Sequence, residues 1–221
     1  MSRGPLRAAA SDPTRDRLLD AAEVLFAEKG YAEASVREIT ARAGANLAAV
    51  NYHFGDKDTL YREVFLRRFR QLREERIAGI RATRKTRGRK GPKPILHAYV
   101  RMVLTALLTE GSAACNLSQL MLREFLTPRL PAGLFHDELM EPVERELEAA
   151  LREVLPGLSE EEARLGIDSV SGQVIYVVHQ AYVHGGACRN RTVSEPIEQL
   201  TDHIVRFSAA GLRAAARGSR S

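Results

Sequence analysis

The stretch from Ser35 to Asp58 constrains the fold more than any other part of the chain, because it predicts two short helices joined at a glycine. Ser35 followed by Glu38 is a capping box, in which the hydroxyl and the carboxylate each satisfy a backbone N–H at a helix start. A helix therefore begins at Val36. Gly44 ends it, because glycine adopts the positive φ of a helix end at little steric cost.

The second predicted helix follows Asn46, which can cap it. Val50 and Phe54 lie four residues apart and face inward, with Leu47 at the edge of the same stripe. A helix of about two turns is not stable alone in water, so other helices must hold it. Two short helices at a glycine turn are typical of a helix-turn-helix, whose second helix enters the DNA major groove. On this pattern alone, an ordinary helical hairpin in an all-α core is an equally good interpretation.

Residues 15–60 resemble the DNA-binding domain of the TetR (tetracycline-repressor) family of transcriptional regulators. The matching stretch reads RLLDAAEVLFAEKGYAEASVREITARAGANLAAVNYHFGDKDTL. Its markers are the KGY that ends the first helix, the AGAN step at the turn, and the block NYHFGDK from Asn51 to Lys57. Asn51 stands where the family most often has a tyrosine, and LAA at 47–49 replaces a stretch that is often basic or hydroxylated. These departures concern the operator sequence and leave the fold assignment intact.

The outward faces of the two short helices are the predicted DNA contacts. We expect Ala48 and Ala49 to approach thymine methyl groups, Asn51 to hydrogen-bond adenine or a phosphate, and the remaining residues to position the DNA backbone. The predicted DNA-binding residues are Ser35, Val36, Arg37, Asn46, Leu47, Ala48, Ala49, Asn51, Tyr52, His53 and Lys57.

Charge is distributed unevenly along the chain. Residues 1–93 contain 21 Lys and Arg against 12 Asp and Glu, a balance of +9, whereas residues 94–221 contain 12 against 16, a balance of −4. A basic N-terminal part suits phosphate binding, because counterion release supplies most non-specific DNA affinity. Such a charge run can also be merely a solvated surface, so it supports the DNA-binding interpretation without proving it.

Composition predicts a soluble, intracellular protein. The 221 residues suffice for one or two domains, and no run of about 18 uncharged apolar residues predicts a membrane span. The first 13 residues lack the apolar core of a secretion signal, so we expect a cytoplasmic location. Cys115 and Cys188 form no CxxC or Cys/His cluster, which disfavours a disulfide framework or a metal site. A redox switch is the weaker alternative to two unpaired cysteines, and no cofactor is expected.

The pattern along the chain predicts an all-α protein of about nine helices. Residues 1–13 are expected to form a flexible arm, 14–60 the helix-turn-helix domain, and 61–221 a ligand-binding and dimerisation domain with a basic loop at about 82–93. Helices are expected at about 14–29, 36–43, 47–54, 57–82, 94–110, 112–126, 135–155, 160–184 and 194–216. In the family, the fourth helix is the lever that changes the spacing of two DNA-binding heads.

The last two helices carry more apolar surface than one packed side requires, which implies a second partner. The resemblance implies that the partner is a second copy, because family members dimerise through a four-helix bundle made by these helices. Completion of a monomeric core is the alternative. The predicted interface residues are Val170, Val174, Val177, Val178, Ala181, Ile197, Leu200, Ile204 and Phe207.

Polar residues on otherwise apolar helices predict a small-molecule site, because ligand pockets combine apolar walls with a few polar groups. The resemblance implies an effector in this domain, and the segments LSQLMLREFLTP and SGQVIYVVHQ are similar to regulators linked to cefoperazone and chloramphenicol sensitivity. The predicted effector-binding residues are His97, Arg101, Asn116, Gln119, Arg123, Glu124, Gln173, Tyr176, His179 and Gln180.

These patterns together predict a homodimeric transcriptional regulator, a repressor, that binds a palindromic operator in double-stranded DNA and responds to a small-molecule effector. A sequence-non-specific, architectural DNA-binding protein is the first alternative, favoured by the basic arm and loop. An all-α enzyme is the second, but the sequence lacks a nucleophile elbow, a phosphate-binding glycine loop and metal-ligand spacing such as HExxH.

Overall fold

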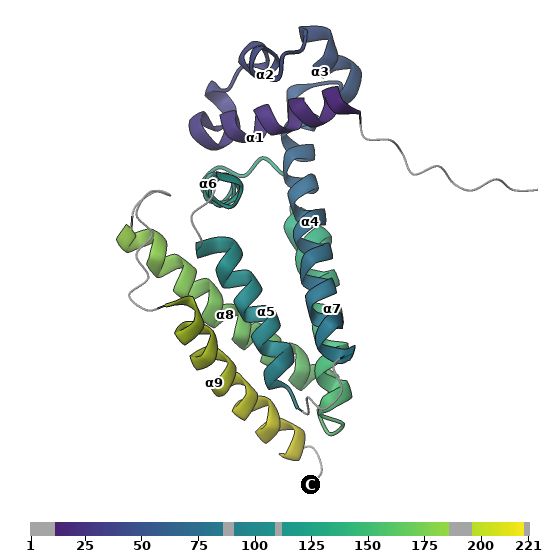
Figure 1. Cartoon of the computed structure of the whole chain (residues 1–221), viewed down its shortest axis with the longest axis vertical. Helices are drawn as coiled ribbons and strands as arrows, with labels where there is room; N and C mark the ends of the chain where they lie inside the picture. Colours follow the sequence, from purple (N-terminus) through teal and green to yellow (C-terminus); the bar gives the residue numbers. More distant parts are fainter. Residues whose placement is uncertain (1–11, 86–90, 109–111, 186–195, 219–221) are drawn as a thin grey trace, which may run out of the picture. The chain divides into compact units, whose positions relative to one another are not determined.

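The computed structural model of the chain describes residues 12–85, 91–108, 112–185 and 196–218 (Figure 1). Within these ranges it forms nine α-helices and a short π-helical segment, with no strand. The all-α prediction of about nine helices is therefore confirmed. Almost all of the predicted arm, residues 86–90 of the basic loop and Cys188 lie outside the described residues. No helix within these ranges combines the length and apolarity that a membrane crossing requires.

The described residues divide into two compact units. The first, the head, comprises the chain up to Arg67 together with Gln119–Pro128, and the second, the effector unit, comprises the described parts of Arg68–Ser118 and Arg129–Ser221. The boundary thus falls later than the predicted residue 60, because the first three turns of the fourth helix pack in the head. A short stretch from the middle of the chain also belongs to the head.

The head contains α1 (Pro13–Glu33), α2 (Val36–Ala43) and α3 (Leu47–Phe54). The capping box at Ser35 forms as predicted: its Oγ accepts from the Glu38 N–H at 3.2 Å, and the Glu38 carboxylate accepts from the Ser35 N–H at 3.0 Å. Gly44 ends α2 at φ 60° and ψ 40°. Asn46 caps α3 by accepting from the Ala49 N–H at 2.9 Å. Local sequence therefore determines where both short helices begin and where α2 ends.

Helix α1 differs from its predicted end at residue 29. Gly30 adopts φ 82° and ψ 170°, which interrupts the helix as expected, but one more short turn continues to Glu33. The Ala34 N–H then donates to the Gly30 carbonyl oxygen at 3.2 Å. Gly30 is thus a break within α1, and the final turn directs the chain into α2.

Apolar side chains from α1 form the centre of the head. Leu18, Ala22 and Phe26 are fully buried, and the Phe26 ring meets the Tyr61 ring edge-on with centroids 5.0 Å apart. Tyr61 lies on α4 (Lys57–Lys85). On the same helix, Arg67 donates to Asp20 at 2.7 Å and to the buried Glu23 at 3.0 Å. Packing and ion pairs therefore hold the first turns of α4 against α1.

In the effector unit, α5 (Lys93–Leu108), α8 (Glu160–Gly185) and α9 (Ile197–Gly218) lie side by side (Figure 1). Helix α7 (Glu141–Val154) packs on α8. Close packing of α8 and α9 depends on Gly166, where a Cβ atom would collide with Leu212. The helix predicted at 135–155 is interrupted: His136–Met140 is π-helical, and α7 begins only at Glu141. Helix α6 (Ser112–Leu126) begins in the effector unit and ends in the head.

Substitution of Glu38 by glutamine is expected to change the pH dependence of stability. The Lys29 ammonium, 2.5 Å away, together with the hydrogen bonds from Ser35, lowers the pKa of the Glu38 carboxyl from 4.5 to about 2. The ionised carboxylate therefore stabilises the folded chain above pH 4.5, and this contribution is lost as the pH falls towards 2. We expect Glu38→Gln to lower the free energy of unfolding at pH 7 and to reduce its decline between pH 5 and pH 2, as measured by urea denaturation. Parallel pH profiles of Glu38→Gln and wild type would contradict this assignment.

Candidate functional site

Helix α3 presents one face to solvent while the other is buried. Val50 is 1% exposed and Phe54 6%, whereas Leu47 is 56% and Tyr52 84% exposed. Ala48 and Asn51 are also exposed, and Ala49 is partly exposed. The buried pair fixes the helix, so its outer face is displayed on a rigid support. This outer face combines small, amide, aliphatic and phenol groups, which suit contacts to base edges and to the DNA backbone.

Helix α2 adds positive charge beside the turn. Ser35 and Arg37 are exposed, and Val36 is partly exposed. Arg37 and Arg42 make no ion pair within the described ranges, so both guanidinium groups remain available to phosphates. Arg42 was not among the predicted contacts, although a basic residue in the last turn of α2 was a visible signal.

His53 and Lys57 make intramolecular contacts that the sequence did not predict. The His53 side chain is only 10% exposed, and its Nδ1 lies 3.7 Å from the Asp12 carboxylate at the start of α1. Lys57 Nζ donates to the Tyr31 carbonyl oxygen at 2.6 Å and lies 4.3 Å from the centroid of the Tyr31 ring. These two side chains therefore hold the head together instead of lying free on its surface. The Asn46 side-chain oxygen is likewise engaged as the α3 cap.

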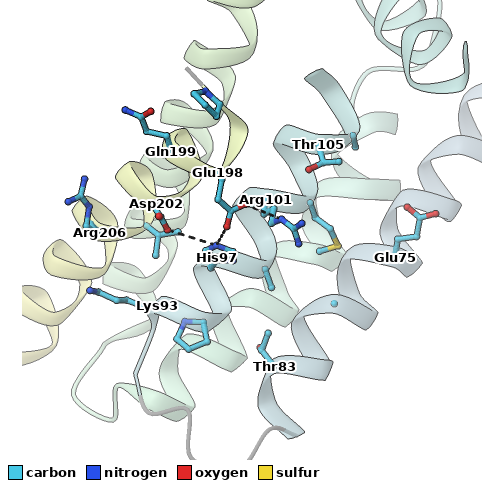
Figure 2. A pocket seen from close by; sticks show the side chains of 17 residues that line it. Glu75, Thr83, Lys93, His97, Arg101, Thr105, Glu198, Gln199, Asp202 and Arg206 are labelled. Carbon is cyan, nitrogen blue, oxygen red and sulfur yellow. Dashed lines mark hydrogen bonds and ion pairs between the residues drawn. The ribbon is translucent and has the colours of Figure 1, made fainter. Parts of the chain in front are cut away.

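The effector unit contains an open groove with a volume of about 1430 Å³ between α4, α5 and α9 (Figure 2). Its α4 side includes Glu75, Gly79 and Thr83, and α5 contributes the apolar residues Ala98 and Met102. The end of the Met102 side chain lies where a Cβ of Gly79 would be, so this glycine makes room for it. The groove thus has a partly apolar wall on α4 and α5.

Charged side chains from α5 and α9 face one another across the groove. His97 Nε2 lies 3.1 Å from a Glu198 carboxylate oxygen and 4.0 Å from one of Asp202, and Arg101 Nε lies 3.3 Å from Glu198 (Figure 2). These groups are more than one-third exposed, so the pairs add little to stability. Their exposure leaves them able to exchange partners with a ligand. The sequence prediction missed the α9 residues because it assigned that helix wholly to dimerisation.

Two of the ten predicted effector residues, His97 and Arg101, line this groove. Arg123 and Glu124 instead contact the head. Arg123 donates from Nε to the Ala27 carbonyl oxygen at 3.2 Å and from Nη2 to that of Glu28 at 2.9 Å. Glu124 accepts from the Tyr61 hydroxyl at 3.1 Å. These two side chains therefore join the end of α6 to α1 and α4, a contact that spacing on α6 does not reveal.

The other six predicted effector residues do not line the groove. Gln173 donates to the Ser208 hydroxyl at 3.1 Å and so joins α8 to α9. Tyr176 and His179 are exposed on α8. The remaining three, all partly exposed, are Asn116, Gln119 and Gln180.

The predicted dimer residues fall into two groups by burial. Those whose side chains are buried within the single chain are Val170, Val174, Ala181 and Ile204. Those that are partly exposed are Val177, Val178, Ile197 and Leu200. Phe207 is 67% exposed, and α8 adds Ile175 at 65%, Tyr176 at 64% and Leu165 at 49%. We call the surface of Leu165, Ile175, Tyr176 and Phe207 the α8–α9 face. The unburied apolar surface predicted for these helices therefore exists, but partly on other residues.

Two family models match the chain. The model for bacterial regulatory proteins of the tetR family matches residues 18–64, and the tetracyclin repressor-like C-terminal domain matches residues 97–211. The chain belongs to the TetR family. The second match alone spans more than half of the chain, and the two matches correspond to the head and to most of the effector unit. This confirms the resemblance on which the sequence prediction relied, and it places the chain among regulatory proteins rather than enzymes.

Individual TetR-family relatives agree with this assignment. The HTH-type transcriptional dual regulator CecR of Shigella flexneri is 31% identical over 149 residues, which span 62% of this chain and 62% of that protein. The chain thus matches less than two thirds of the length of this curated relative. A TetR-family regulator from Mesorhizobium loti has the same fold with a TM-score of 0.73 and 21% identity, covering 91% of this chain and 98% of that one. FadR of Bacillus subtilis, solved in complex with stearoyl-CoA, has a TM-score of 0.66 and 18% identity, covering 89% and 98%.

Replacement of Arg123 by methionine is expected to destabilise the head. The change removes two charge-assisted hydrogen bonds to the carbonyl oxygens that precede the break at Gly30, while it keeps an apolar side chain of similar length. Because Arg123 is exposed, we expect a loss of about 1 kcal/mol in the free energy of unfolding of the full chain. Arg62→Met, at an exposed arginine of α4 in the head, is the matched control. An equal loss in both variants would show that the contacts of Arg123 are not the cause.

Proposed function

We propose that this chain is a homodimeric, sequence-specific DNA-binding regulator that represses transcription in the cytoplasm and responds to a small-molecule effector. The observation that carries the proposal is the outer face of α3, which is exposed at Leu47, Ala48, Asn51 and Tyr52 while its inner face is buried. Membership of the TetR family and the similarity to CecR, an HTH-type transcriptional dual regulator, support the same function.

In this proposal α3 enters the major groove, where Ala48 and Ala49 contact thymine methyl groups and Asn51 hydrogen-bonds a base or a phosphate. Arg37 and Arg42 bind the adjacent phosphates. Tyr52 contacts the DNA backbone, and Ser35 does the same from the start of α2. Val36 and Leu47 supply apolar contact at the edges. Asn46, His53 and Lys57 contribute by holding the head in shape.

A glutamate at position 48 is expected to abolish operator binding. The substitution places a negative charge on the face of α3 that approaches the DNA. Position 48 is exposed, so the fold is retained. The operator is selected by the wild-type protein from a pool of random duplexes, and binding is measured by gel shift. We expect Ala48→Glu to weaken binding by about 100-fold or more. Ala78→Glu makes the same change at an exposed alanine of α4 and is expected to bind like wild type.

Two outcomes of this experiment would contradict the proposal. Unchanged binding by Ala48→Glu would remove α3 as the DNA-reading helix. Failure of the selection to enrich any sequence would favour a non-specific DNA-binding protein, because such a protein binds random duplexes equally well. An enriched palindrome, with half-sites about one helical turn apart, supports a two-fold dimer.

The α8–α9 face supports the proposal of a dimer. Phe207, Tyr176 and Ile175 are each more than 60% exposed, and a large apolar surface of this kind is characteristic of an interaction site. In a two-fold dimer the same face of each copy would meet the other and form a four-helix bundle. Val177, Val178, Ile197 and Leu200 are further apolar residues of these two helices that are partly exposed.

A charge in the centre of the α8–α9 face is expected to separate the two copies. Phe207→Glu would bury one carboxylate from each copy at the interface, which is strongly unfavourable without a partner. We expect sedimentation analysis to give a dimer for wild type and a monomer for Phe207→Glu at the same concentration. Leu126→Glu, which changes a 71% exposed leucine at the end of α6, is the control and should remain dimeric. A monomeric wild type that still binds its operator at full strength would contradict this mechanism.

The groove between α4, α5 and α9 is the proposed effector site. Its volume of about 1430 Å³ exceeds that of a typical ligand pocket, and it combines an apolar wall with charged groups from facing helices. FadR, which has the same fold, was solved with stearoyl-CoA, so this fold is able to hold a small molecule. Helix α4 links the groove to the head by continuing through both units. An effector that favours one conformation of α4 would alter operator affinity by no more than its differential affinity for the two conformations.

A further inference from the structure

The effector unit contains a buried arginine that the proposed function does not use. Arg76 is 5% exposed, on the inner side of α4. It occupies the position between Leu72 and Ile80 at four-residue spacing, where the apolar stripe of this helix would otherwise continue. An arginine in that position is costly, because a guanidinium loses hydration when it is buried and does not lose its charge within the accessible pH range.

Arg76 makes no ion pair among the described residues. Its Nε is buried and has no hydrogen-bond partner. Other arginines of α4 are different: Arg73 pairs with Glu138 at 3.4 Å, Arg81 with Glu146 at 2.8 Å, and Arg84 with the same Glu146 at 3.2 Å. Acidic partners are therefore supplied where α4 arginines are more exposed, and not at the buried one.

The groups that act on Arg76 electrostatically are the phenol of Tyr99 and the carboxylate of Glu75. Tyr99 is 3% exposed, and its hydroxyl lies 3.4 Å from that of Ser171. Glu75 is exposed and accepts a hydrogen bond from Gln71 at 2.9 Å, so it does not neutralise Arg76 in the core. Loss of water on burial lowers the pKa of the Arg76 guanidinium from its usual value. The surroundings thus provide neutral hydroxyl groups and a cation, but no buried anion.

The proposed effector groove lies along the same segment of α4. Glu75 and Gly79, which flank Arg76 in the sequence, both line it, whereas Arg76 itself lies behind this lining on the buried side of α4. Met102 lies over Gly79, and its flexible side chain can turn aside more easily than a branched or aromatic one. Ser118 on α6 is a further buried polar residue without a partner for its hydroxyl, in the same unit. Buried polar groups that the protein leaves unsatisfied are the groups that a ligand would satisfy.

We propose that Arg76 binds the anionic group of the effector, and that the effector is therefore an organic carboxylate or phosphate with an apolar body that lies in the groove between α4 and α5. The inference rests on the proposed function, because it names the chemical class of the effector. A charged ligand group would form charge-assisted hydrogen bonds with the guanidinium, which are stronger in a dry site than at a surface.

The test compares octanoate with octanamide, which have nearly the same shape and differ in charge. Binding to the full chain is followed without DNA by thermal unfolding and calorimetry. We expect octanoate to raise the Tm of wild type and octanamide to raise it little. Arg76→Met is expected to bind octanoate about 10- to 100-fold more weakly, since a hydrogen bond to a charged group accounts for a change of that size.

The ligand-free Tm of Arg76→Met provides an independent readout. Because the variant replaces an uncompensated buried charge by an apolar side chain of similar length, its Tm should equal or exceed that of wild type. A clearly lower Tm would mean that Arg76 supports the fold, and this would overturn the proposal. Arg145→Met, at a 75% exposed arginine of α7 that does not line the groove, is the control for a surface cation and should retain octanoate binding. Loss of octanoate binding in Arg101→Met but not in Arg76→Met would place the anion at the rim of the groove. This result would also overturn the proposal.

Failure of this proposal is distinguishable from failure of the proposed function. Arg76→Met should bind the selected operator as wild type does, because the substitution removes an effector contact and leaves α3 unchanged. If octanoate, octyl phosphate and benzoate all leave the Tm of wild type unchanged while operator binding is intact, the chain is a DNA-binding regulator without an anion site at Arg76. If the operator selection fails while octanoate binds through Arg76, the anion site is supported and the proposed function is contradicted.

Discussion

The burial of Val50 and Phe54 is the interaction on which the DNA-binding surface depends. Helix α3 has eight residues, and a helix of that length is not stable in water without tertiary packing. With 1% and 6% of these two side chains exposed, the helix is held on one side and presents the other to solvent. The same packing accounts for the exposure of Tyr52, because a helix anchored at positions 50 and 54 must turn position 52 outward. The geometry of the surface thus follows from two apolar contacts.

Polar contacts keep that head rigid around its apolar centre. Lys57 binds the carbonyl oxygen of Tyr31, and Arg123 binds the carbonyl oxygens of Ala27 and Glu28 near the break at Gly30. These cations meet backbone oxygens that the end of a helix leaves without partners, which suits the negative end of the helix dipole. The last turns of α6 thereby belong to the head, although the helix begins in the effector unit. Together with α4, this helix offers a covalent route by which a change in the effector unit can reach the DNA-binding surface.

The arginines of α4 show that the same residue type serves different purposes along one helix. Arg67, Arg81 and Arg84 join neighbouring helices through carboxylates, whereas Arg76 is buried, has no partner for its Nε and makes no ion pair among the residues that the structure describes. A surface ion pair contributes little to stability, but an uncompensated buried charge opposes folding. The chain supplies acidic partners elsewhere on the same helix, so we infer that a ligand supplies the anion for Arg76.

The sequence alone determined the class of the fold, the starts of α2 and α3, the glycine at their junction and the family. These features depend on contacts within a few residues, such as the Ser35 and Glu38 capping box, and on apolar periodicity along single helices. Only the tertiary structure decided that His53 and Arg123 bind within the head, that Ile204 is buried in its own chain while Tyr176 is exposed, and that Arg76 has no carboxylate partner. The physical reason is that a helix period specifies which side chains share a face, whereas the partner of that face comes from residues distant in the chain. Polar side chains with several possible partners are therefore the positions where the sequence was least informative.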